Sequence, residues 1–213
     1  MIVLLGWFVV VLLVVIALTL SLMFYEMGFP IWISTVLGTL TTYTLLMFLA
    51  ILLHWALRSV VGINPCYLPS WKQPLWGTMA AIHSRIFSAL KLFLPGDYVC
   101  NGLLRLFGMR IGTGTVIMGS VTDPEIISVG DDVHVGSGTI LSGHIMSTMD
   151  RRVFRAPIVI EDGVRIGTNC VITPGVHIGP NAVVLPNTHV RTNQKLEGDR
   201  CYGGNPASEV PTL

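Results

Sequence analysis

The sequence predicts a mainly β fold, in which a parallel β-helix follows a two-helix transmembrane hairpin and an amphipathic linker helix. Three observations predict it. Aliphatic residues recur every six positions in the second half of the chain, the chain begins with a charge-free apolar run, and a second long apolar run follows directly. We expect the hairpin over residues 1–58, the linker over 59–109 and the β-helix over 110–213.

The six-residue period is the basis for the β-helix. Neither a helix nor a single strand repeats every six residues. A coil of three short strands does, because each strand directs one aliphatic side chain inward before the chain turns a corner, and each coil then packs on the next. The aliphatic positions are Ile111, Ile117, Val129, Val135 and Leu141 in a first block and Ile160, Ile166, Ile172, Ile178, Val184, Val190 and Leu196 in a second.

The two blocks are out of phase, because 19 residues rather than 18 separate Leu141 from Ile160. The intervening segment Ile145–Pro157 is predicted to leave the coil as a loop, with His144 at its base. Such excursions map to one face of a solenoid and often carry function. Asp123 also breaks the first block, since it puts a carboxylate at an inward aliphatic position.

Two apolar runs predict the hairpin. Residues Ile2–Met23 carry no charge and are long enough to cross a bilayer, which takes about 20 residues in a helix. A signal peptide is the alternative, but Lys and Arg are absent near Met1. In the second run, Ile31–Leu57, small residues at every fourth position would let the two helices approach closely. These residues are Ser34, Gly38 and Thr42.

The charges predict the orientation. Basic residues begin only after the second run, at Arg58, Lys72, Arg85 and Lys91. By the positive-inside rule they lie in the cytoplasm. We therefore expect an integral protein of an inner or plasma membrane with its β-helix on the cytoplasmic side.

The linker carries the spacing of an amphipathic helix lying in the headgroup region, with its tryptophans as interface anchors. A soluble connecting helix is the alternative. The apolar positions are Trp71, Trp76, Ile82, Ile86, Leu90 and Leu94.

Composition excludes some classes of protein. Charged residues make up 12% of the chain, against about 25% in ordinary soluble domains. The net charge is +1 and the basic residues form no run, so we expect no nucleic-acid partner. The four cysteines form no CxxC pair and fit free thiols in a reducing compartment.

Several segments resemble a known family. They are Leu104–Gly108 leading into Ile111-Gly112, Asp123–Ser128 leading into Val129–Asp131, Gly143-His144, and Gly204–Ala207. Together with the repeat, they resemble the hexapeptide-repeat left-handed β-helix acyltransferase superfamily. The closest likeness is to the membrane-anchored acyltransferase-like modules of poly-lysine-type peptide synthetases and their free-standing relatives.

The resemblance implies a left-handed β-helix that assembles as a homotrimer, with active sites in the clefts between subunits. It implies acyl transfer from acyl-CoA or a carrier-linked thioester, used as a co-substrate and with no tightly bound cofactor. Beyond the bilayer, the implied partners are a carrier protein or the machinery of glycan or peptide synthesis. The acceptor and the donor-binding residues are left unassigned.

His144 is the candidate catalytic residue. Acyl transfer needs a base for the proton of the attacking hydroxyl or amine, and a neutral imidazole suits that task near neutral pH. The resemblance implies the same role, since the superfamily's catalytic histidine occurs just before such a loop. Candidate carboxylates to orient the imidazole are Asp150, Asp131 and Asp132, although a backbone carbonyl would serve equally well.

Two other functions compete with this reading. His134, His177 and His189 occupy outward positions of the repeat, and β-helix carbonic anhydrases hold zinc with histidines contributed across a subunit interface. We assign no metal site from the sequence. The second alternative is a non-catalytic trimeric scaffold or assembly partner, suggested by Asp123 and by the imperfect last coils around Gln194 and Tyr202.

Overall fold

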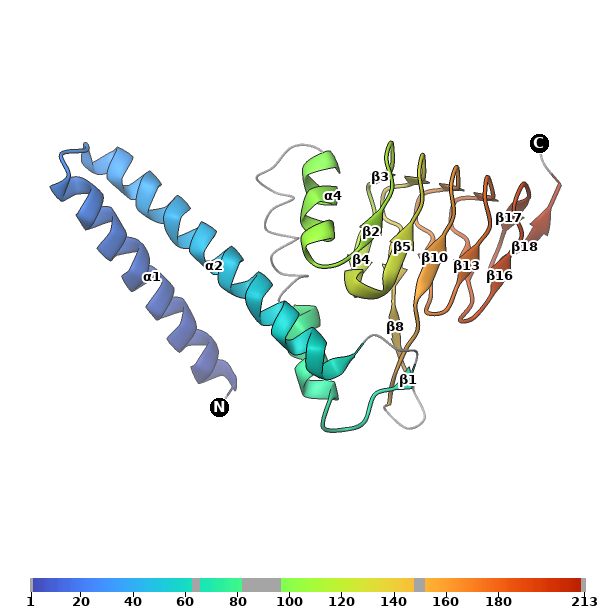
Figure 1. Cartoon of the computed structure of the whole chain (residues 1–213), viewed down its shortest axis with the longest axis horizontal. Helices are drawn as coiled ribbons and strands as arrows, with labels where there is room; N and C mark the ends of the chain where they lie inside the picture. Colours follow the sequence, from blue (N-terminus) through green and yellow to red (C-terminus); the bar gives the residue numbers. More distant parts are fainter. Residues whose placement is uncertain (1, 63–65, 82–96, 148–151, 212–213) are drawn as a thin grey trace. The chain divides into compact units, whose positions relative to one another are not determined.

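The computed structural model describes residues 2–62, 66–81, 97–147 and 152–211 (Figure 1). Side chains are described from Val14 onward, except at 66 and 97–99. The chain divides into two compact units, Met1–Leu52 and Leu53–Leu213. The second unit begins inside a helix, so the end of that helix, the described linker residues and the solenoid form one compact unit.

The first unit is a pair of helices. Helix α1 spans Ile2–Glu26 and helix α2 spans Ile31–Val61. A side chain at Gly38 would place its Cβ 2.6 Å from the backbone nitrogen of Ser21 and 2.9 Å from the carbonyl oxygen of Ala17. Ser34 and Thr42 are buried as well. The small residues of α2 therefore face α1, as the sequence predicts.

Helix α2 is long and apolar enough to cross a membrane, judged by length and composition over the described residues. The described part of α1 contributes a shorter apolar stretch, Val14–Glu26. The helix α2 matches the predicted second apolar run and continues past it to Val61.

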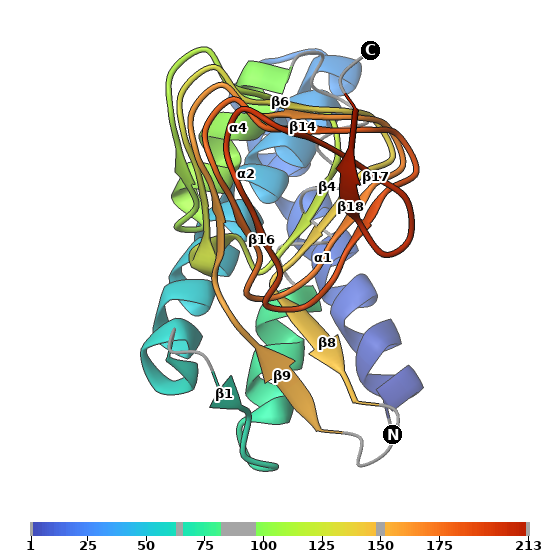
Figure 2. The same cartoon turned by 90° about the vertical axis from the view of Figure 1, so that its right-hand side faces the viewer.

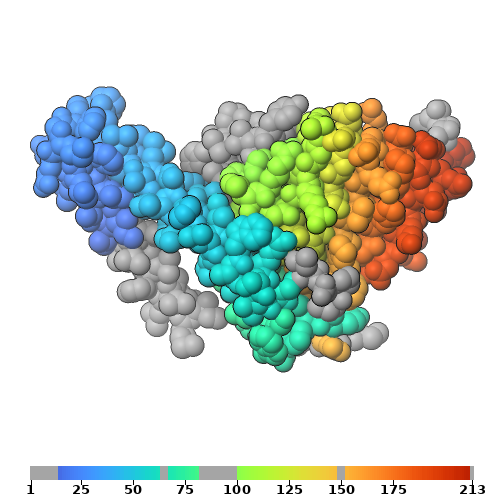
Figure 3. Space-filling view, viewed as in Figure 1, coloured from blue at the N-terminus to red at the C-terminus, as the bar shows by residue number. Residues whose placement is uncertain are grey.

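The second unit is built around a parallel β-solenoid of about five coils. Figure 2 looks along its axis and shows the coils stacked on one another, and Figure 3 shows them as adjoining bands of colour. Within the described residues the coils form three parallel sheets. The first contains β2 (Arg110–Ile111), β5 (Ile127–Val129), β10 (Ile158–Ile160), β13 (His177–Ile178) and β16 (Lys195–Leu196).

The second parallel sheet contains β3 (Val116–Ile117), β6 (His134–Val135), β11 (Arg165–Ile166), β14 (Val183–Val184) and β17 (Cys201–Gly203), and β18 (Ser208–Val210) ends it in antiparallel pairing. The third contains β4 (Ser120–Thr122), β7 (Ile140–Ser142), β12 (Val171–Ile172) and β15 (His189–Val190). The predicted inward aliphatic residues form one buried core through the coils, against which Ile111 of the first coil packs partly buried.

Helix α4 (Asp97–Leu106) packs on the first coil. Its Cys100 and Leu104 join the solenoid core. The end of α2 contacts carbonyls at the end of α4 and directly after it. The indole nitrogen of Trp55 donates to Leu106 O at 3.0 Å, and His54 Nε2 lies 3.1 Å from Phe107 O. Carbonyls at a helix C-terminus lack partners within the helix, and here His54 and Trp55, which belong to the second unit, serve as those partners.

Two successive coils are interrupted at the same corner, between the third sheet and the first. In one coil the 3-10 helix η1 (Pro124–Ile126) is inserted, and in the next the chain leaves the stack as β8 (His144–Met146) and β9 (Val153–Arg155). Strand β1 (Cys66–Tyr67) pairs with β9. Figure 2 shows these three strands outside the coils. The predicted excursion is thus an antiparallel hairpin.

The expected inward position of Asp123 needs correction. Val121, not Asp123, is the inward residue of β4, in register with Leu141 of β7. Asp123 lies at the corner that follows, with φ +59°. The inserted 3-10 helix absorbs the shift of phase, and the core period resumes at Val129.

The linker differs from the predicted membrane-surface helix in one described residue. Residues 73–81 are helical, and Trp71 is 61% exposed. Trp76, however, is only 8% exposed and packs with Val61, Leu68, Met79 and Val153, so it is not an interface anchor. The other apolar positions of the pattern, from Ile82 to Leu94, lie outside the described residues.

Candidate active site

His144 and Asp123 meet at the interrupted corner. Register pairs Thr122 of β4 with Ser142 of β7, so the residues that follow each strand lie one above the other. Gly143 makes the approach close. A Cβ there would lie 3.0 Å from that of Asp123 and 2.8 Å from Ile126 Cδ1. Two departures from the repeat, 21 residues apart in sequence, therefore form one site.

The two side chains form a hydrogen-bonded pair. His144 Nδ1 lies 2.5 Å from Asp123 Oδ2. The Asp123 side chain is fully buried, whereas the His144 side chain is 24% exposed. A protonated Nδ1 donates to the carboxylate and leaves the lone pair of Nε2 available. Asp123 thus orients the imidazole, whose side chain still reaches solvent, and a general base requires both properties.

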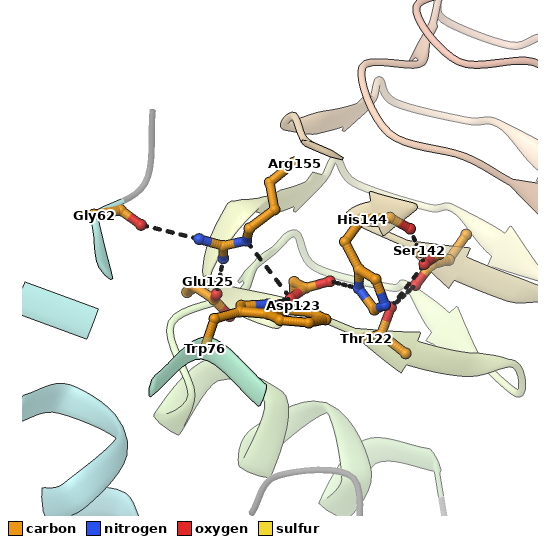
Figure 4. A network of polar contacts seen from close by, with 9 residues as sticks. Gly62, Trp76, Thr122, Asp123, Glu125, Ser142, His144 and Arg155 are labelled. Atoms are coloured by element: carbon orange, nitrogen blue, oxygen red, sulfur yellow. Dashed lines mark hydrogen bonds and ion pairs between the residues drawn. The ribbon is translucent and has the colours of Figure 1, made fainter. Parts of the chain in front are cut away.

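Asp123 is charged in spite of its burial. Burial alone would raise the pKa of its carboxyl group, but the hydrogen bond and charge of His144, the charge of Arg155 and a hydrogen bond from Trp76 outweigh it and lower the pKa. Trp76 Nε1 donates to Asp123 Oδ1 at 2.7 Å, and Arg155 Nε lies 3.8 Å from the same oxygen. Figure 4 shows Asp123 between His144 and Arg155.

Arg155 connects three elements beside the His144–Asp123 pair. It is 1% exposed, forms an ion pair with Glu125 of η1, and donates from Nη1 to Gly62 O at 3.1 Å. Gly62 directly follows α2. Arg155 belongs to β9, so one buried cation joins the excursion, the inserted 3-10 helix and the end of α2 (Figure 4).

Glu125 shares this cation with Asp123. Burial, followed by repulsion from Asp123, raises the pKa of Glu125 to about 7, and Arg155 opposes the rise. Oε2 of Glu125 also lacks a hydrogen-bond partner among the described residues. The protonated form of Glu125 is therefore favoured below neutral pH, while Asp123 stays ionised.

Glu125 predicts a specific pH dependence of stability. Its pKa in the folded protein lies above the ordinary value of 4.5, so between about pH 4.5 and pH 7 the folded protein holds a proton that the unfolded chain has released. The contribution of Glu125 to the free energy of unfolding should therefore fall as pH rises through that window, by at most on the order of 3 kcal/mol. Glu125→Gln should remove this contribution, so the stability advantage of the wild type over the variant should shrink as pH rises from about 4.5 to 7, as measured by thermal unfolding at several pH values.

Asp123 does not contribute in this window, because its lowered pKa affects stability only around and below the ordinary value of 3.8. The exposed Glu197→Gln is the matched control and should retain the wild-type slope. An unchanged slope in Glu125→Gln would show that Glu125 is not the group that titrates.

The structure does not bring Asp131 or Asp132 to His144. Asp131 Oδ1 accepts a hydrogen bond from Thr113 Oγ1 at 3.0 Å, on the neighbouring coil. Asp132 adopts a left-handed backbone conformation at the same corner, with φ +52°. Asp150 lies outside the described residues. The carboxylate on His144 is Asp123 instead.

The three outward histidines are distributed over three sheets. His134 is in β6, His177 in β13 and His189 in β15. His177 Nε2 lies 2.7 Å from Glu161 Oε1. One face of the solenoid therefore presents only one of these histidines, and the described residues contain no group of three or more side chains able to hold a metal ion.

Sequence reasoning missed Asp123, Trp76 and Arg155. The available signal for Asp123 was its break in the aliphatic period directly before Pro124, two residues from a second acidic residue. Trp76 and Arg155 carried no such signal, because both reach the site through tertiary contacts.

Comparisons with known proteins agree with the fold. A family model described as "Bacterial transferase hexapeptide (six repeats)" matches residues 157–192. A structure of a hexapeptide-repeat-containing acetyltransferase from Vibrio cholerae in complex with acetyl coenzyme A is similar at 29% identity, covering 63% of this chain and 90% of that one, with a TM-score of 0.52. No curated protein sequence matches the chain.

A second structure of the Vibrio cholerae acetyltransferase matches at 25% identity over 65% of this chain and 92% of that chain, with a TM-score of 0.54. A galactoside acetyltransferase in complex with coenzyme A matches at 16% identity over 64% of this chain and 81% of that chain, with a TM-score of 0.53. At that identity the last match shows the fold alone.

Proposed function

We propose that this protein is an acyltransferase that moves an acyl or aminoacyl group from a CoA or carrier-linked thioester to a hydroxyl or amine, with His144 as the general base. The observation that carries the proposal is the pairing of His144 with buried Asp123 at the corner where the excursion begins. The likeness to an acetyltransferase solved with acetyl coenzyme A supports the donor class.

The proposed reaction follows from the pair. His144 Nε2 accepts the proton of the acceptor hydroxyl or amine while the acceptor atom bonds to the thioester carbonyl carbon. The tetrahedral intermediate then collapses, the carbon–sulfur bond breaks, and the thiolate takes the proton from the imidazolium. Asp123 stabilises the imidazolium between these steps because its carboxylate accepts the Nδ1–H hydrogen bond.

The assembly belongs to the proposal as well. The resemblance supports left-handed coils and a homotrimer with the donor in a cleft between subunits. The partial exposure of His144 is compatible with a donor that reaches it from the solvent side. The likeness to poly-lysine-type synthetase modules supports an aminoacyl donor on a carrier protein as one choice to test.

We further propose that α1 and α2 cross the bilayer and that the solenoid lies on the cytoplasmic side. The length and apolar composition of α2 support a span, and the basic residues that begin at Arg58 support the orientation. An active site held at a membrane surface favours an acceptor that is itself lipid-linked or close to the membrane, such as a glycan precursor or nascent peptide.

The two alternatives have less support. The scaffold reading depended on Asp123 as a defect of the repeat and on the imperfect last coils around Gln194 and Tyr202. The first of these grounds is weakened, because Asp123 is the partner of His144. A zinc site would need histidines of several subunits to converge, although each face of one subunit presents only one of the three outward histidines.

Release of free thiol from the donor by the purified full-length protein tests the proposed function. Acetyl-CoA, longer acyl-CoA and carrier-linked aminoacyl thioesters should be compared, with simple hydroxyl and amine acceptors. Thiol release that depends on the acceptor supports the proposal. Failure of every donor class would contradict it, and stoichiometric zinc in the purified protein would favour the anhydrase alternative.

A further inference from the structure

Trp76 lies outside the solenoid in sequence and contacts both members of the proposed catalytic pair, Asp123 and His144. It lies in the helical segment 73–81, between the end of α2 and helix α4. Its indole nitrogen donates to Asp123 Oδ1 at 2.7 Å. Its ring packs against the imidazole of His144, with centroids 4.5 Å apart and planes at 67° (Figure 4).

These two contacts restrain the pair in complementary ways. Asp123 Oδ2 faces His144 and Oδ1 faces Trp76, so the carboxylate is held at both oxygens and its rotation would break one charge-assisted hydrogen bond. The indole ring occupies the space beside the imidazole and opposes its rotation about χ2. Because Trp76 is 8% exposed, it also limits the access of water to that side of the pair.

A purely structural role does not explain the polar contact. Trp76 packs in a small apolar cluster with Val61, Leu68, Met79 and Val153, which phenylalanine could also fill. A buried indole N–H needs an acceptor, and here that acceptor is the carboxylate that orients His144. The Nη1 donor of Arg155 on Gly62 O attaches the same site to the end of α2.

We propose that Trp76 is a positioning residue of the active site, which holds Asp123 through its indole N–H and His144 through its ring, so that Nδ1 keeps its proton and Nε2 remains the base. The inference rests on the proposed function of His144. It makes the helical segment 73–81 part of the catalytic apparatus, since the solenoid residues alone would lack this donor.

The test compares Trp76→Phe with Trp71→Phe in the full-length protein. Trp71 is 61% exposed and contacts Lys72, so it is a matched control for loss of an indole. Trp76→Phe should lower kcat about tenfold, the effect of losing one hydrogen bond to a charged group, and leave the KM for the thioester donor within about twofold. Trp71→Phe should leave kcat unchanged.

A double-mutant cycle separates positioning from general destabilisation. If Trp76 acts through Asp123, Trp76→Phe should cost less than about twofold in a protein that already carries Asp123→Asn. Effects that simply multiply would overturn the proposal. Replacing Trp76 with benzothienylalanine, which keeps the ring shape and lacks only the N–H, covers the case in which the phenylalanine variant does not fold.

A second measurement does not depend on turnover. Proton NMR of the protein without substrate should show the Nδ1–H of His144, identified by its absence in His144→Gln. That proton should exchange with water about tenfold faster in Trp76→Phe than in the wild type, because local access of water rises. If the wild type transfers no acyl group but this difference is seen, the proposed function fails and the positioning role stands; equal exchange rates would overturn the positioning role.

Discussion

His144→Ala is expected to lower kcat by about a hundredfold to ten-thousandfold, the usual contribution of a positioned general base. The reason is geometric. Nδ1 of the imidazole is bound to Asp123, so Nε2 is the nitrogen left to accept the proton of the acceptor. Steady-state kinetics with the best thioester donor measures the effect, and donor KM should change little because the lost group acts on the acceptor.

His134→Ala is the matched control for this substitution. His134 is exposed in β6, at an outward position of a regular coil. Its removal should leave both kcat and the thermal unfolding temperature near the wild-type values. If His144→Ala retains wild-type turnover, His144 is not the base, whatever the state of the fold.

Arg155→Met is expected to cost about 3–5 kcal/mol in the free energy of unfolding, the penalty for leaving a buried ionic group without its partner. Arg155 is 1% exposed and is the cation paired with Glu125, beside the buried carboxylate of Asp123. Its loss also removes the donor to Gly62 O, so the connection between the end of α2 and β9 should weaken. Denaturant or thermal unfolding measures the cost.

Arg165→Met provides the comparison, because Arg165 is exposed in β11 and the change in side chain is the same. It should alter stability by less than about 0.5 kcal/mol. Equal stability of Arg155→Met and Arg165→Met would show that the buried network does not support the corner.

The aliphatic period predicted the coils and the excursion because each coil repeats one local rule. An inward residue is followed by a corner, and the 19-residue spacing from Leu141 to Ile160 leaves the chain no way to stay in phase without a departure. The departure is an antiparallel hairpin of β8 and β9, to which β1 adds a third strand from outside the repeat.

The partner of His144 could not be predicted in the same way. Asp131 and Asp132 are closer to His144 in sequence than Asp123 is. In a stack of coils, however, the residues that share a corner with His144 are those one full coil, or about three strands, earlier in the chain. An inserted 3-10 helix then shifts the phase, so that Val121 faces the core and Asp123 lies at the corner beside His144. The six-residue period does not reveal this shift, because it places Asp123 rather than Val121 at the inward position.

Trp76 and Arg155 reach the site through tertiary contacts, and no local pattern predicts such contacts. Trp76 is 47 residues from the carboxylate that it binds, and Arg155 is 93 residues from Gly62. The spacing of Trp76 with other apolar residues predicted a membrane-facing helix surface, whereas the same amphipathic spacing also suits a helix that packs against protein. In the structure Trp76 packs against protein, as a member of the apolar cluster that contains Val61 and Met79.

A structure of the full-length protein with bound coenzyme A tests the central claim most directly. We expect the thiol of the pantetheine arm beside His144 Nε2, with the imidazole still bound to Asp123 and with room for an acceptor atom about 3–3.5 Å from the thioester carbon. Coenzyme A bound on another face of the solenoid, with His144 remote from its sulfur, would contradict the assignment of His144 as the base for acyl transfer.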